Sequence, residues 1–239
     1  MKGSIFLCLF LLCSCASSPL NQTNNIERVN KIINSSPIKK PIRRTTNESK
    51  ILIDKIEEKL VTSSVSYCQN EAKDCEWSIK QEINMSFNAY ASLEDGKKEI
   101  VLFTGLVSGV HYEEELAFVL AHEMGHHLAN HINESIFTTY AGMALGSVLG
   151  AAAGDPISGA AYGAAIGRNT FSISQENEAD KIALEILREA GYDLKKAKMV
   201  LLRMSRMSSI YYSEWLSSHP SGPERILHFE SNIYENTEL

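Results

Sequence analysis

The chain has 239 residues, of which 44% are hydrophobic and 22% charged, a composition typical of a globular protein with a sizeable core. Its formal net charge is −6, so it lacks the basic surplus on which nucleic-acid binding usually depends. We therefore expect no nucleic acid among its partners.

The N-terminus has the pattern of an export signal. Lys2 precedes an apolar run from Ile5 to Leu12, which is too short to span a bilayer. Small residues follow, and Leu12-Cys13-Ser14-Cys15 resembles a bacterial lipobox. Cys15 is the expected lipidation site, because lipidation of Cys13 would place bulky Leu12 at the cleavage point. We expect residues 1–14 to be a signal peptide, with simple cleavage and no lipid as the alternative.

The segment after the signal is rich in Ser, Asn, Thr, Pro and basic residues and shows little apolar periodicity. Residues 15–47 are therefore predicted to be a flexible tether. One domain, residues 48–239, should follow it. Within that domain, Cys68 and Cys75 are predicted to form a disulfide, since export leads to an oxidising compartment.

The first half of the domain contains the predicted strands. A helix is expected near 48–64, and strands near 81–92 and 98–103, joined by a turn at Asp95-Gly96. Most of the remaining chain has helical patterns. The predicted fold class is therefore α+β, mainly helical, with a small β-sheet.

His122-Glu123-Met124-Gly125-His126 is the most informative motif. Histidines four apart share one face of a helix, so both can offer ring nitrogens to a single ion. Zinc favours these ligands, and a site with three protein ligands leaves a place for water. Glu123 is the candidate general base. His127 and His131 lie off the ligand face and are expected to be structural. The motif predicts a zinc peptidase with one Zn²⁺ per chain.

Residues 141–167 form a Gly/Ala-rich segment in which glycine recurs at every fourth position, interrupted at Asp155-Pro156. Small residues at this spacing let two helices approach closely, so we predict a helical hairpin. Two alternatives remain open from the sequence: the hairpin packs on its own domain, or it contacts a membrane or a protein partner.

A second acidic motif begins the next predicted helix, where Ser172 and Gln175 have capping-box spacing. Glu176 is the candidate third metal ligand. Asp180, one turn later, is expected to accept a hydrogen bond from a ligand histidine. Glu178 points elsewhere and is expected to be solvated.

These two motifs together resemble the HtpX/Oma-type gluzincin metallopeptidases, a family that includes the CAAX prenyl proteases. Further segments fit the resemblance: Asn88-Ala89-Tyr90-Ala91, Thr104-Gly105-Leu106, and Ser218-His219-Pro220 with Arg225-Ile226. The likeness covers about residues 80–230 and is nearest to the periplasmic lipoprotein members. It implies a zincin-type domain whose edge strand, residues 88–91, lies beside the active-site helix and binds peptide as an added strand.

The resemblance implies a zinc metalloendopeptidase of the cell envelope, anchored to the outer membrane and facing the periplasm. Its expected partners are misfolded or misassembled protein substrates, the membrane and the outer-membrane assembly machinery. The alternative is an envelope chaperone or assembly lipoprotein with weak or latent protease activity.

His219 and Arg225 are the candidate donors to the oxyanion of the tetrahedral intermediate. For His219 two other roles stay open. It could close the site as a fourth zinc ligand, which would inhibit the enzyme, or it could be purely structural.

Overall fold

The computed structural model describes residues 19–37, 39–70, 75–167, 171–208, 219–220 and 222–234. Cys15 and the signal segment lie outside these residues. In chain order the elements are α1 (Pro19–Ser35), α2 (Thr46–Asn70), β1 (Trp77–Glu82), β2 (Ala89–Glu94), β3 (Lys97–Phe103), α3 (Thr104–Gly109), α4 (Glu113–Leu128), α5 (His131–Ala152), α6 (Pro156–Gly167), α7 (Ile173–Glu189), α8 (Leu194–Ala197), α9 (Met199–Ser208) and α11 (Pro223–Tyr234). The predicted class, mainly helical α+β with a small sheet, is confirmed.

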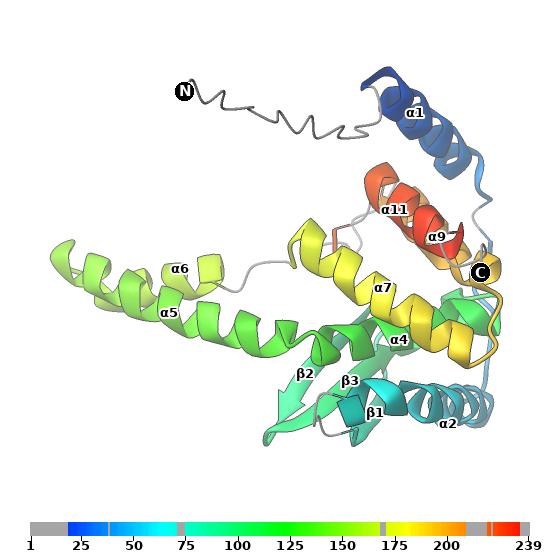
Figure 1. Ribbon diagram of the computed structural model, residues 1–239. Coiled ribbons are helices and arrows are strands. Elements are labelled where there is room, and N and C mark those ends of the chain that lie inside the picture. The colour runs from blue at the N-terminus through cyan, green and yellow to red at the C-terminus, as the bar shows by residue number, and fades with distance from the viewer. Residues whose placement is uncertain are drawn as a thin grey trace, which may run out of the picture.

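The sheet is three-stranded, in the order β1-β3-β2, with β1 parallel and β2 antiparallel to β3. The predicted turn joins β2 to β3, where Asp95 and Gly96 have φ values of 51° and 77°. Both values lie in the left-handed region that a two-residue hairpin turn of type I′ requires. Ile100 and Leu102 of β3 are fully buried, and α4 packs against this side of the sheet (Figure 1).

The prediction of one strand over 81–92 is wrong, because the structure has two strands, 77–82 and 89–94, with a break between them. In the break, the Asn84 side chain accepts a hydrogen bond from the Ser86 N–H at 2.9 Å. The Asn84 carbonyl accepts another from the Gly105 N–H at 2.8 Å. The Asn84 side chain thus bonds to backbone two residues on and replaces the strand ladder with a turn.

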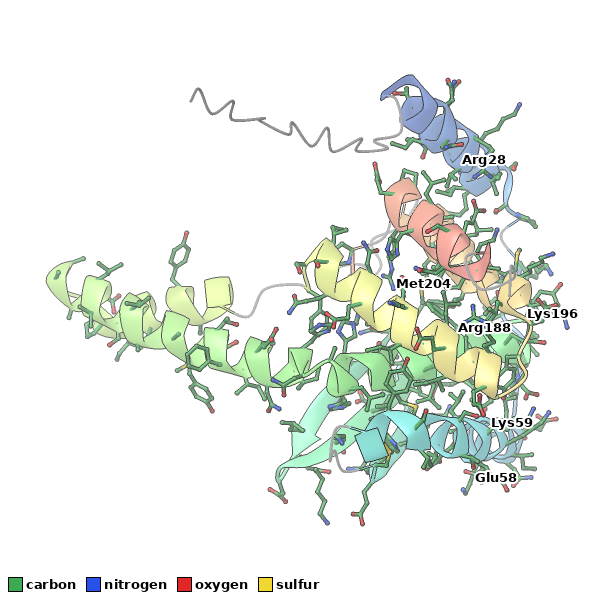
Figure 2. All side chains as sticks on the ribbon, in the orientation of Figure 1. Arg28, Glu58, Lys59, Arg188, Lys196 and Met204 are labelled. Carbon is green, nitrogen blue, oxygen red and sulfur yellow. A yellow bond between two sulfur atoms is a disulfide. The ribbon has the colours of Figure 1, made fainter. Side chains whose placement is uncertain are left out.

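The predicted tether is also corrected, because residues 19–35 form α1, which packs against α9 and α11. Val29 and Ile33 are buried, and the Arg28 guanidinium contacts Glu230 of α11 at 2.7 Å; Figure 2 labels Arg28 on α1. Further on, the Ile42 N–H donates to the Ser108 carbonyl at 2.7 Å. The apolar residues of α1 are few and lie among polar residues, so the sequence gives only a weak helical signal there. In the folded domain α11 covers these apolar residues.

Helices α4 and α7 form the centre of the domain. Every residue of α4 from Glu115 to Leu128 is buried. Ser172 and Gln175 form the predicted capping box at the start of α7, with hydrogen bonds of 3.2 and 3.0 Å. Gly191, with φ of 74°, follows the end of this helix. The two helices approach at Gly125, where an added Cβ would lie 2.7 Å from the Ala179 carbonyl oxygen.

Two other predictions can be compared directly with the structure. The disulfide between Cys68 and Cys75 is present and closes a loop at the end of α2. The Gly/Ala-rich segment forms the predicted hairpin from α5 and α6, which projects from the body of the domain (Figure 1). Among the residues that the structure describes, this hairpin packs on its own domain, one of the two alternatives, at its base, where His131 and Ile132 are buried.

Candidate metal centre

Four side chains from three parts of the chain meet at one buried point. His122 and His126 come from α4, Glu176 from the first turn of α7, and His219 from the segment before α11. One ligand atom from each lies within 4.8 Å of the others, and all four side chains are at most 1% exposed. The structure therefore brings together the three predicted ligands and the predicted candidate for a fourth.

The distances between these atoms fit a tetrahedral ion. Nε2 of His122 lies 3.1 Å from Nε2 of His126 and 3.2 Å from Nδ1 of His219. Glu176 Oε1 lies 3.3 Å from His126 Nε2 and 3.0 Å from His219 Nδ1. A tetrahedron with zinc bonds of about 2.0–2.1 Å has edges of about 3.3 Å. Nitrogen and carboxylate donors at these separations suit Zn²⁺ in both chemistry and size.

Asp180 supports His122 as the sequence predicts. Its Oδ1 lies 2.9 Å from His122 Nδ1, so this nitrogen carries the proton and Nε2 keeps its lone pair for the ion. Burial opposes a charge on His122, but the carboxylates of Glu176 and Asp180 outweigh it and raise the pKa of the metal-free imidazole to about 9. The negative field of these carboxylates would also stabilise a bound cation.

Arg225 lies behind the ligands and binds their carboxylates. Its Nε and Nη2 each donate to Asp180 at 2.7 Å, and Nη1 lies 2.5 Å from Glu176. Burial alone would raise the pKa of Glu176, but His219, Arg225 and His122 hold it well below its usual range. In this arrangement Arg225 positions Asp180 and Glu176, whereas the sequence assigned it to the oxyanion.

His131, predicted to be structural, supports the ligand His126. The Nδ1 atoms of the two rings lie 3.1 Å apart, and His131 Nε2 lies 3.3 Å from Glu178 Oε2. The tautomers that satisfy both contacts leave His126 Nε2 free to accept an ion. Asn130, with φ of 66°, separates α4 from α5 and turns His131 back toward His126. Glu178 is exposed as predicted but also contacts His131.

Glu123, the predicted base, lies beside His219. It is fully buried, and neither carboxylate oxygen has a hydrogen-bond partner among the described residues. Nε2 of His219 lies 3.5 Å from Glu123 Oε1. An ionised carboxylate buried without donors is costly, so this position favours a polar ligand beside the four donors. Phe171 closes another side, with its ring stacked on His126 at 3.8 Å between centroids.

The predicted substrate strand is at a sheet edge. Ala89, Tyr90 and Ala91 belong to β2, which pairs with β3 along one side. Within the described part of the chain no strand pairs with its other side. Asn88 precedes β2, and its carbonyl accepts a hydrogen bond from the Phe103 N–H at 3.1 Å. Since α4 packs against β2, this edge lies next to the helix that carries the histidines.

Comparison with known proteins agrees with this geometry. The sequence profile of Peptidase family M48 matches residues 58–233, which include the sheet and all four donors. The chain belongs to peptidase family M48. It is also 34% identical over 138 residues to the mitochondrial metalloendopeptidase OMA1 of Arabidopsis thaliana. That match covers 57% of this chain and 28% of the relative, so the chain spans well under half of that protein.

Proposed function

We propose that this protein is a zinc-dependent endopeptidase of the bacterial cell envelope that hydrolyses misfolded or misassembled proteins. The observation that carries the proposal is the buried carboxylate of Glu123, which lies beside four buried donors and accepts no hydrogen bond from the part of the chain that the structure describes. Membership of family M48 and the likeness to a named metalloendopeptidase support the reaction class. The predicted export signal and the Cys68–Cys75 disulfide support an oxidising compartment outside the cytoplasm.

The chain supplies metal ligands, a base and a substrate edge for peptide hydrolysis. His122, His126 and Glu176 would hold the zinc, which when bound polarises the peptide carbonyl and makes water a better nucleophile. Glu123 accepts the proton of the attacking water and then donates it to the leaving amine. The edge of β2 holds the substrate backbone extended, as an added strand. Asp180 and Arg225 keep the ligands in place from behind.

His219 completes the set of donors in this structure. Its Nδ1 lies 3.2 Å from His122 Nε2 and 3.0 Å from Glu176 Oε1, at the position that a fourth ligand would take. A zinc site with four protein ligands is closed, whereas a catalytic one keeps a position open. Of the three roles considered for His219, the geometry best supports the inhibitory one. We infer that this conformation is a resting form from which His219 must withdraw.

Glu123→Gln tests the proposed reaction. It removes the base and no ligand, so zinc content and the far-UV spectrum should stay unchanged while casein cleavage falls by about 10³-fold or more. Glu176→Ala is the matched variant, because it removes a ligand and should lower zinc content as well as activity. Chelator should abolish the cleavage by the parent protein. Cleavage by Glu123→Gln within tenfold of the parent would show that another group is the base.

A further inference from the structure

The α5–α6 hairpin has an unusual surface. From Ser135 to Gly167 the only charged residue is Asp155. Seven large apolar or aromatic side chains on these helices are between 66% and 82% exposed: Phe137, Tyr140, Leu145, Val148, Leu149, Ile157 and Tyr162. Figure 2 shows that the side chains on this projecting part are mostly carbon. A soluble protein rarely exposes so many large apolar groups together unless they contact a partner.

In a helical hairpin in water, large apolar side chains are expected at the contact between the helices. Here they lie on the outside. Glycines lie at the contact between α5 and α6: an added Cβ on Gly146 would lie 2.1 Å from the Gly159 carbonyl oxygen, and one on Gly163 would lie 2.0 Å from that of Gly142. Small residues therefore face inward and large apolar residues outward. The hydrophobic effect does not favour this arrangement in water. In lipid it is the common one, since close backbone packing holds the helices together there.

The apolar surface extends around α5 on all the sides that α6 leaves uncovered. At 100° per residue, Gly142, Gly146 and Gly150 lie within about 80° of arc, which is the side toward α6. The large apolar residues from Met143 to Leu149 are spread over about 240° of the remaining circumference. A helix that docks in a protein groove has one apolar face, whereas a helix that is apolar all round suits a lipid environment.

We propose that the α5–α6 hairpin inserts into one leaflet of a lipid bilayer. Helix α5 is long and apolar enough to cross a membrane by length and composition. However, α6 has 12 residues and is therefore about 18 Å long. The hydrocarbon core of a bilayer is about 30 Å thick, so the paired helices reach through about one leaflet. Asp155 at the tip opposes insertion, but its cost is comparable to the gain from burying one or two large apolar side chains. Seven such side chains outweigh it.

A tryptophan placed on the hairpin tests insertion directly in the full-length protein. In Leu149→Trp, the added emission, taken as the difference from the parent with its native tryptophans, should fall at least about twofold when vesicle lipids carry brominated chains. Ile51→Trp on α2 is the matched control, because Ile51 is also exposed but lies in another part of the fold. It should lose less than about a tenth of its emission. Equal, weak quenching of both reporters would overturn the proposal.

The lipid composition distinguishes insertion from charge attraction. Because the hairpin is almost uncharged, quenching of Leu149→Trp should be similar in phosphatidylcholine vesicles and in vesicles with equal parts phosphatidylethanolamine and phosphatidylglycerol. Quenching restricted to the anionic vesicles would overturn the proposal in favour of charge attraction by the basic cluster before α2, which consists of Lys39, Lys40, Arg43 and Arg44. A concentration-dependent blue shift without vesicles, and no bromine quenching with them, would instead identify a second copy of the chain as the partner. Leu145→Glu/Val148→Glu, added to a Phe137→Trp reporter, should abolish quenching.

Discussion

His219 is the residue whose removal most clearly separates a closed site from an open one. If it is a fourth ligand, His219→Ala should retain zinc through His122, His126 and Glu176 and cleave casein faster than the parent protein. His228→Ala is a matched control, because His228 lies on α11 and bonds to Asn232. A fall of about 10²-fold in His219→Ala would assign His219 to the oxyanion instead. An unchanged rate would leave it a structural role.

His131 gives a second prediction at this scale. His131→Phe removes the hydrogen bond that joins the Nδ1 atoms of His126 and His131 at 3.1 Å, so the His126 ring and its tautomer should be less well fixed. We expect zinc affinity, measured by competition with a chelator, to weaken by about 10- to 100-fold. His127→Phe is the control, since His127 contacts the Glu99 carbonyl on β3 and not the site. Unchanged zinc affinity in His131→Phe would refute a positioning role.

At the scale of elements, the site depends on how closely α4 approaches α7. Gly125→Ala should gain about 1 kcal/mol of helix propensity, but its Cβ would lie 2.7 Å from the Ala179 carbonyl oxygen. Overpacking against backbone costs about 1–3 kcal/mol, so the clash should exceed the gain. We expect a lower free energy of unfolding in urea and weaker zinc binding. Ala179→Gly should not rescue the variant, because the clash is with backbone. A stability gain would contradict this account.

The elements around the site differ in how far they could be predicted from the sequence. The spacing of His122 and His126, the capping box of Ser172 and the Asp95-Gly96 turn are local patterns, and local sequence was enough to predict them. Helix α1 and the contact between His126 and His131 were missed. Both depend on contacts that form only after folding: α11 covers the apolar side of α1, and the left-handed Asn130 redirects the chain.

At the scale of the whole molecule, α1 changes the expected relation between domain and membrane. A free tether of 33 residues would have a root-mean-square span of about 30 Å. Since α1 begins at Pro19 and packs on α9 and α11, only three residues separate it from Cys15. An anchor at Cys15 would therefore hold the start of α1 within about 14 Å of the lipid-bearing cysteine. The α5–α6 hairpin would then be part of a domain kept close to lipid.

The anchor itself is tested by labelling cells with a fatty-acid analogue. The parent protein and Cys13→Ala should both carry the label, whereas Cys15→Ala should not, because its lipid acceptor is gone. Membrane fractionation adds a second readout: several acyl chains on one cysteine give stable attachment, so Cys15→Ala should be released more readily by carbonate or salt washing. The hairpin should still retain part of that variant, and further loss on adding Leu145→Glu/Val148→Glu would separate the two attachments. Undiminished labelling of Cys15→Ala would place the lipid elsewhere, with Cys13 the next candidate.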